Sequence, residues 1–304
     1  MEKIPVVLLF IVSLAAGLGG TMVKNHYVKS LSDGVAGYHL YNAVTAIVCS
    51  LTLLALSGGK LSISPFTLLL AVIFGLVTVV QQVANAAALA QGPLSYTSVI
   101  GSMSTVITAF SGLILFGESI SVTQIIGIVL MMFCLVLSVK KDTDSEKKAA
   151  ARWLILCILT CFATGAIGIL QKLHQSSAYK GELTAFLIIA FAFSFVFSAG
   201  NIAVLKLKMP KTESSDKLVF HKKKSPLPLL VALFVVAGVG IALNNMINLH
   251  LSGTVPSAIF FPIVNGGGLI LTTLVSVFFF RERLTRIQWL GISLGFVATM
   301  LLCL

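Results

Sequence analysis

Charge is what this chain has least of. Charged residues make up 10% of its 304 positions, whereas a soluble domain carries roughly 25%. A chain with so little charge cannot cover a folded surface that faces water. Together with a hydrophobic share of 57% and a mean hydropathy of +1.03, this scarcity predicts an all-α integral membrane protein.

Carboxylates are also missing from the middle of every long uncharged run, and the whole chain has only 10 acidic residues. A proton-coupled exporter of lipophilic cations normally needs such a carboxylate, because the proton and the substrate must compete for one negative charge. The sequence therefore favours a neutral, zwitterionic or anionic substrate over a cationic drug.

Other kinds of chemistry lack their sequence signatures. The chain contains neither a Gly-rich phosphate loop nor a His-Glu-x-x-His motif, its five histidines are scattered, and its five cysteines all lie in apolar runs. These features predict no ATP hydrolysis, no enzyme activity, no metal and no cofactor. The net charge of +11 does not indicate a nucleic-acid partner, because the lysines lie between apolar runs rather than on one folded face.

The uncharged runs fall into two sets with the same order of lengths. They cover residues 4–23, 34–59, 61–117 and 119–139, and then 153–171, 183–205, 225–280 and 287–304. The third run of each set is far too long for one crossing of a hydrocarbon core about 30 Å thick. Breaks at Gly92-Pro93 and at 252–256 divide these two runs. One, one, two and one helices per set predict ten transmembrane helices.

The two sets can be aligned residue by residue. With Gly75 placed on Gly238, the residues Gln81, Gln82, Asn85 and Pro93 fall on Asn244, Asn245, Asn248 and Pro256, and after a slip of one residue Glu118 falls on Glu282. This duplication predicts a first repeat at 1–139, a charged connector at 140–152 and a second repeat at 153–304, which holds a polar basic loop at 206–224. Because five is odd, the second repeat must enter the membrane from the opposite side, giving two inverted five-helix repeats.

The distribution of positive charge predicts an orientation. Of the 21 lysines and arginines, four fall on the predicted side of the termini and the rest on the side of the long connectors. The positive-inside bias therefore places the connectors in the cytoplasm and both termini outside.

A family resemblance rests on the segment 116–127, Phe-Gly-Glu-Ser-Ile-Ser-Val-Thr-Gln-Ile-Ile-Gly, and on its second copy at 280–291. Both resemble the end of an EamA repeat in the drug/metabolite transporter superfamily, where a glutamate follows the fourth helix and a glutamine and a glycine lie along the fifth. The resemblance implies a ten-helix basket whose central cavity is lined mainly by helices three, four, eight and nine, with help from one and six. It also implies cytoplasmic termini, opposite to the lysine bias.

Carboxamides in the apolar runs are the predicted substrate-binding residues, because amides buried in hydrocarbon are costly unless something uses them. They are Gln81, Gln82, Asn85, Asn244, Asn245, Asn248 and Asn265. Amides offer donors and acceptors in equal measure, which suits hydroxyls, nucleobases or a zwitterion. The alternative is hydrogen bonding between helices, worth about 0.6–2 kcal/mol per amide.

A second group of residues is predicted to act in gating or structure. It comprises Pro93, Pro256, Pro262, Gly266, Gly267, Glu118, Glu282, Lys24, Lys172 and His250. The glycines at 266–268 predict either a broken ninth helix or close helix packing. The two glutamates precede helix N-termini, where they either cap the helix or couple to protons.

Three residues in this group, two lysines and a histidine, have two interpretations each. Lys24 and Lys172 are expected to end the first and sixth helices, where they either snorkel to the interface or bind a substrate carboxylate or phosphate. His250, near the end of the eighth helix, is either an interfacial residue or a proton sensor.

These features predict a secondary transporter that moves a small polar metabolite by alternating access. The substrate classes are amino acids, nucleosides or nucleobases, and sugar-like molecules. The expected partners are this small-molecule substrate and the lipid bilayer, in a multi-pass protein of the plasma or inner membrane, as monomer or homodimer. The alternatives are a multidrug exporter or a lipid-linked flippase and, outside transport, a membrane receptor or scaffold.

Overall fold

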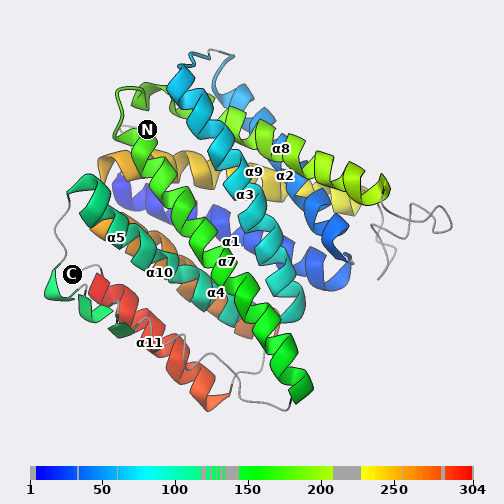
Figure 1. Cartoon of the computed structure of the whole chain (residues 1–304), viewed down its shortest axis with the longest axis vertical. Coiled ribbons are helices and arrows are strands. Elements are labelled where there is room, and N and C mark those ends of the chain that lie inside the picture. The colour runs from blue at the N-terminus through cyan, green and yellow to red at the C-terminus, as the bar shows by residue number, and fades with distance from the viewer. Residues whose placement is uncertain are drawn as a thin grey trace.

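A computed structural model describes residues 5–32, 34–59, 61–117, 121–123, 125–127, 129–130, 133, 144–207, 227–255, 257–281 and 285–302. Within these residues every regular element is helical (Figure 1). Seven of the described helical spans are long and apolar enough to cross a membrane, and two shorter apolar helices lie at Ile263–Phe278 and Trp289–Ala298. The predicted all-α membrane fold is confirmed.

The helices of the first half follow the predicted order. They are α1 (Val6–Ser30), α2 (Gly34–Leu56), α3 (Pro65–Gln91), α4 (Leu94–Ser102) and α5 (Ser104–Phe116). The turn predicted around Gly92-Pro93 is present, since α3 ends and α4 begins on either side of it. The helix predicted at 119–139 lies largely outside the described residues.

The second half repeats this order. It contains α7 (Asp144–Gln175), the short 3-10 helix η1 (Lys180–Glu182), α8 (Leu183–Leu207), α9 (Leu227–Thr254), α10 (Ser257–Phe278) and α11 (Arg286–Leu302). The second long run is divided between α9 and α10, as predicted, although Pro256 itself lies outside the described residues.

Three helix boundaries were predicted wrongly, all of them at charged residues. Helix α1 does not end at Lys24 but continues to Ser30. Helix α7 begins at Asp144, inside the predicted connector, and ends at Gln175 rather than at Lys172. The reason is that a charge ends an apolar run without ending a helix, because lysine is itself a good helix former.

A helix break, which was one of the two interpretations of the ninth span, is found in the fourth span instead. Helix α10 runs without interruption through Asn265 and the three glycines that follow, so the broken-helix interpretation is wrong. The fourth span is divided at Met103, whose N–H bonds to the Ile100 carbonyl in a tighter i→i+3 turn, 3.2 Å long. In the alignment of the two halves, Met103 falls on the glycine run.

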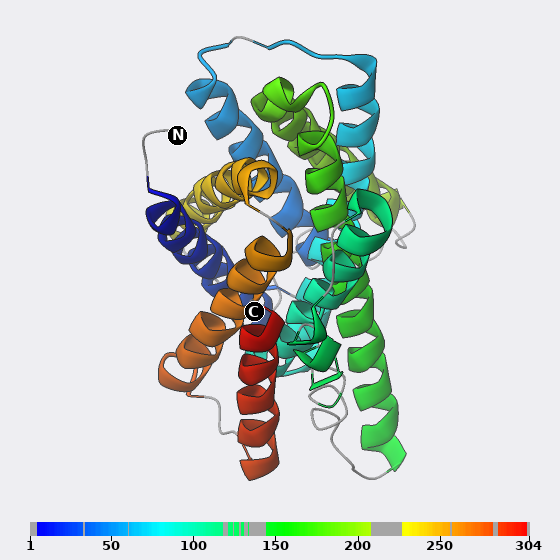
Figure 2. The ribbon, with the colours of Figure 1, turned by 90° about the vertical axis from the view of Figure 1, so that its left-hand side faces the viewer.

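Helix packing follows the duplication. The most extensive contacts join α2 with α8, α3 with α7 and α1 with α9, followed by α3 with α8 and α2 with α9. Exchanging the two halves converts the α3–α7 pair into α9–α1 and the α3–α8 pair into α9–α2, and leaves α2–α8 unchanged. Figure 2 shows α1, α9 and α10 on one side of the bundle and α3 and α7 on the other. The repeat boundaries at 139 and 153 stay predictions.

Aromatic and aliphatic side chains together fill the interior, and large apolar side chains of both kinds cover the outside. Phe74, Phe186 and Phe191 pack together between α3 and α8. Large apolar side chains remain exposed along the outer helix faces, such as Ile114 at 75% and Phe278 at 74%. Such faces fit a lipid environment and would be unfavourable in water.

Candidate functional site

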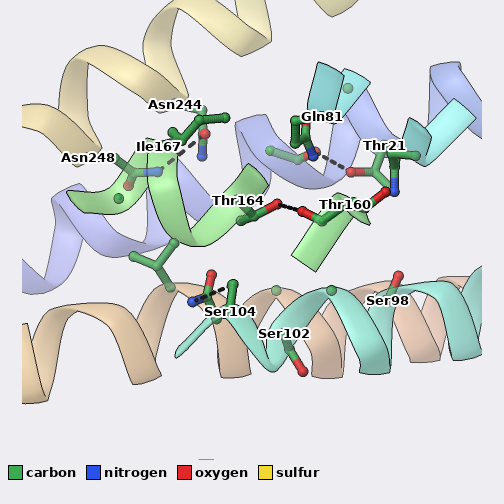
Figure 3. Close-up of a pocket in the computed structure, with 18 of the residues that line it drawn as sticks. Thr21, Gln81, Ser98, Ser102, Ser104, Thr160, Thr164, Ile167, Asn244 and Asn248 are labelled. Atoms are coloured by element: carbon green, nitrogen blue, oxygen red, sulfur yellow. Dashed lines mark hydrogen bonds between the residues drawn. The ribbon is translucent and has the colours of Figure 1, made fainter. Parts of the chain in front are cut away.

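A cavity of about 350 Å³ lies between α1, α3, α4, α5, α7, α9 and α10 (Figure 3). These helices are the ones that the family resemblance implied, and α8 adds Phe191 to the lining. All seven predicted amides line the cavity: Gln81, Gln82 and Asn85 from α3, Asn244, Asn245 and Asn248 from α9, and Asn265 from α10. The volume lies at the lower end of the range of small-molecule sites, about 300–1,000 Å³. That these amides bind a substrate stays a prediction.

The α9 amides are tied to α1 by hydrogen bonds. The Ser13 hydroxyl donates to Oδ1 of Asn248 at 2.6 Å. Nδ2 of Asn244 donates to the Ser13 carbonyl at 2.8 Å and to its hydroxyl oxygen at 3.0 Å. Nδ2 of Asn248 donates to Oδ1 of Asn244 at 3.3 Å. For Asn244 and Asn248, this geometry fits the interpretation that they join helices.

The other two amides of the second half also have protein partners. Gln171 of α7 donates to Oδ1 of Asn245 at 3.4 Å. Nδ2 of Asn265 donates to the Thr105 hydroxyl of α5 at 2.8 Å. Part of the hydrogen-bonding capacity of the α9 and α10 amides is thus already used by protein groups before any ligand binds.

The α3 side of the cavity is different. Within the described part of the chain, Gln81 and Gln82 make no hydrogen bond, and Oε1 of Gln82 is buried. The hydroxyl of Thr78, one turn earlier on the same face, is also buried without a partner. A buried polar atom without a hydrogen bond costs about 1–3 kcal/mol. The α3 wall therefore holds unused hydrogen-bonding capacity that faces the cavity.

Lys24 contributes a positive charge to this wall. Its side chain is 7% exposed and lines the cavity, and its Nζ donates to Oδ1 of Asn85 at 3.0 Å. The interpretation that Lys24 snorkels to the interface is wrong. It lies on the α1 face that carries Gly17, Gly20 and Thr21, and all of these line the cavity.

Lys172 occupies the equivalent position in the second half, because Gly17, Gly20 and Lys24 of the first half match Gly165, Gly168 and Lys172. Its environment is different. Lys172 is half-buried, it is not among the residues that line the cavity, and its Nζ lies 5.9 Å from the ring centroid of Phe116. That arrangement is a cation–π contact. The preceding residue, Gln171, faces the cavity instead.

The remaining predicted residues lie around the cavity rather than in it. Gly267 lies against α1, where a Cβ would fall 2.9 Å from Cδ1 of Leu14, which supports the close-packing interpretation. Gly266 is buried, Pro93 is the residue before α4, and His250 is half-buried on α9. Pro262 lies within α10. Glu118, Glu282 and Pro256 lie outside the described residues.

Ser13, Thr78 and Gln171, which lie in or next to the cavity, were not predicted from the sequence. Thr78 could have been found, because Thr78, Gln82 and Asn85 lie at i, i+4 and i+7 and therefore share a helix face. Ser13 and Gln171 are single polar residues in apolar runs, and a single polar residue carries no periodic signal.

The electrostatics of the cavity are simple. Among the described residues that line it there is no aspartate or glutamate, and Lys24 is the one charged side chain. Figure 3 shows hydroxyls of Ser98, Ser102 and Ser104 along α4 and α5, across from Asn244, Asn248 and Gln81. The cavity is thus a polar space between both halves of the chain, with a single positive charge.

Comparison with known proteins shows which fold the chain shares and which family its first half is similar to. Residues 3–140 match the model of the EamA-like transporter family. A solved structure, described only as the crystal structure of a protein, superimposes with a TM-score of 0.62 at 12% sequence identity, over 97% of this chain and 95% of that one. No curated protein matches the sequence. An EamA segment in the first half, a similar fold over almost all of the chain and a row of apolar helices lead to one conclusion: this is a multi-pass membrane protein whose residues 3–140 are similar to the EamA-like transporter family.

Proposed function

We propose that the protein is a secondary transporter that moves a small polar metabolite across the membrane by alternating access. The observation that carries this proposal is the cavity of about 350 Å³ between the two halves, with unpartnered polar atoms on its α3 wall. In transporters built from inverted repeats, the substrate binds between the repeats near the middle of the bilayer.

The wall of the cavity supports a polar substrate. Gln81 and Gln82 have amide groups free to donate and accept, and Ser98 makes no hydrogen bond within the described residues. A polar ligand would satisfy these groups, whereas a lipophilic one would leave them buried without partners. The multidrug alternative is disfavoured for a second reason, since the described lining carries no carboxylate that could hold a cationic drug.

Alternating access also requires that helices lining the cavity can move apart. Phe260 and Phe261 of α10 line the cavity, with ring centroids 4.9 Å apart, and Phe10 of α1 lies 6.2 Å from Phe260. This aromatic cluster joins α1 to α10 through apolar contacts alone. Apolar contacts are not directional, so such a wall can part and re-form as the helices move.

Uptake by proteoliposomes tests the proposal. The panel contains amino acids, nucleosides, sugars and organic acids, each presented with and without a proton or sodium gradient. Gln82→Leu and Asn245→Leu are expected to abolish uptake of the transported compound, because each replaces an amide in the cavity with an apolar group of similar size.

Two matched variants control for the loss of an amide in a membrane helix. Gln91→Leu on α3 and Asn201→Leu on α8 replace exposed amides that bond only to their own helices. Both are expected to transport normally. Full transport by both cavity variants would reject the site, and transport of no compound in the panel would reject the function.

A further inference from the structure

The buried amine of Lys24 has no negative charge to pair with in the described structure. Its hydrogen bond goes to Asn85, a neutral amide, and no carboxylate is among the described residues that line the cavity. A buried ion without a counter-charge is strongly disfavoured, because desolvation is not offset by a Coulomb attraction. A charged lysine at this position is favourable only if an anion joins it.

The ammonium group can bind such an anion. It carries three donors, and Asn85 takes one of them. On the opposite wall α4 presents Ser98, whose hydroxyl makes no hydrogen bond within the described residues. Figure 3 places Ser98 at the same end of the cavity as Thr21, which lies on α1 three residues before Lys24.

We infer that the substrate is a small organic anion whose carboxylate or phosphate group binds Lys24. This inference rests on the proposed transport function and narrows its substrate class. One negative charge neutralises the single positive charge of the described lining. A zwitterion would leave that charge in excess, and a cation would be repelled by it.

The α3 wall adds a constraint on the rest of the molecule. Gln82 lies three residues before Asn85, about 4.5 Å along the helix axis, and its buried Oε1 needs a donor. Thr78 lies about 6 Å further along. The substrate therefore carries a hydroxyl or amide donor roughly one helical turn from its anionic group, as hydroxy acids and sugar phosphates do.

Matched pairs of small molecules test this inference on the full-length protein in nanodiscs. The anions are lactate, gluconate and glycerol 3-phosphate, their neutral counterparts are lactamide, gluconamide and glycerol, and alanine represents the zwitterions. A ligand that binds only the folded state raises the melting temperature. At least one anion is expected to raise it, and its neutral counterpart is not. A response to lactate or gluconate identifies a carboxylate, and a response to glycerol 3-phosphate alone identifies a phosphate.

The variant Lys24→Met tests whether the anion binds at Lys24 rather than at another positive charge of the protein. It is expected to weaken anion binding at least roughly thirtyfold, the scale for truncating one partner of a buried charge pair. Lys24→Arg keeps the charge and is expected to retain most of the affinity. The matched control is Lys172→Met, which removes the same charge at the equivalent position outside the cavity and is expected to bind normally.

Folding is not the obstacle for Lys24→Met, because the substitution removes a buried charge; its melting temperature without ligand is expected to equal or exceed that of the wild type. The inference is overturned if no anion stabilises the protein, if neutral counterparts stabilise it equally, or if Lys24→Met keeps the response. Asn85→Leu gives a second measurement. Without its hydrogen bond to Asn85, Lys24 should still bind anions, but about tenfold more weakly than in the wild type.

Failure of this inference can be told apart from failure of the transport function. If proteoliposomes take up a neutral compound and Lys24→Met does so equally well, transport stands and the anion inference falls. If an anion binds through Lys24 but neither it nor any other compound crosses the membrane, the anion site stands and transport falls.

Discussion

Gly75 of α3 lies against Ala190 of α8 so closely that a Cβ at Gly75 would fall 2.5 Å from the Ala190 carbonyl oxygen. The aligned glycine of the second half, Gly238, has the same relation to α2, where a Cβ would fall 2.6 Å from Val48 and 3.0 Å from the Thr45 carbonyl oxygen. The two glycines on which the repeats were aligned therefore mark two equivalent helix crossings. Small residues at such crossings let backbones approach closely in a membrane.

Gly75→Ala is expected to destabilise the protein. The new methyl group meets backbone rather than a movable side chain, so the helices must shift, and overpacking of this kind costs about 1–3 kcal/mol. Thermal unfolding in detergent measures the change. Gly200→Ala on α8 is the control, because that helical glycine has open space around it; it should be neutral or stabilising by up to about 1 kcal/mol. Equal stability of the two variants would contradict the crossing.

Replacing amides in the two halves should have opposite effects on stability. Asn248→Leu removes the acceptor of the Ser13 hydroxyl and is expected to lower the free energy of unfolding by about 1–3 kcal/mol. Gln82→Leu removes a buried oxygen without a partner and should leave the melting temperature unchanged or raise it. Unfolding curves of both variants without ligand decide between these outcomes.

A double-mutant cycle checks that Asn248 acts through Ser13. The variants Ser13→Ala, Asn248→Leu and their combination are expected to show a coupling energy above about 0.5 kcal/mol, as contacting residues do. Strict additivity would mean that Asn248 stabilises the protein by some other contact.

Glu182 is expected to hold the start of α3 in place. Its Oε2 accepts from the Ser64 backbone N–H at 3.0 Å and from the Ser64 hydroxyl at 2.9 Å, while Ser64 caps α3 by accepting from the Thr67 N–H at 3.2 Å. Glu182→Ala should lower the melting temperature and speed amide hydrogen exchange at residues 64–68. Glu182→Gln should do so less, because an amide oxygen still accepts. Exchange unchanged by Glu182→Ala would argue against this cap.

Cysteine accessibility tests whether water reaches the cavity. The native Cys49, Cys157 and Cys161 are buried, so they should react slowly with a charged maleimide once Cys134 and Cys303 are replaced by serine. In that background, Ser98→Cys in the cavity should be labelled. Leu113→Cys, 44% exposed on the apolar outer face of α5, should not, because lipid excludes the reagent. Labelling at Leu113 alone would reverse the assignment of inside and outside.

Hydropathy and the duplication were enough to predict the helix order and the amides around the cavity, because both are periodic or repeated features of the sequence. The environment of single polar residues was not predictable. Lys24 and Lys172 are equivalent in the alignment, but Lys24 faces the cavity and Lys172 faces Phe116. Which way a lone lysine points depends on how neighbouring helices rotate, and one sequence carries no record of that rotation.

At the glycines 266–268, local sequence preference suggested a helix break that the structure does not have. Three consecutive glycines lower helix propensity, yet α10 is continuous there, because packing against α1 holds the helix together. At Met103, which follows Gly101 and Ser102 and precedes Ser104, the helix is interrupted, as the low helix propensity of these neighbours allows. Tertiary contacts outweighed local preference at the glycine run.

This difference between Met103 and the glycine run has a mechanical consequence. The fourth span is divided at Met103 into α4 and α5, whereas its counterpart in the second half, α10, is one continuous helix. In a rocking cycle the fourth span could bend at Met103, while α10 would tilt as a rigid helix. The states open to the two faces of the membrane would then not be mirror images. Two states that are not mirror images differ in energy, so in the proposed cycle the empty protein would spend more of its time open to one side of the membrane.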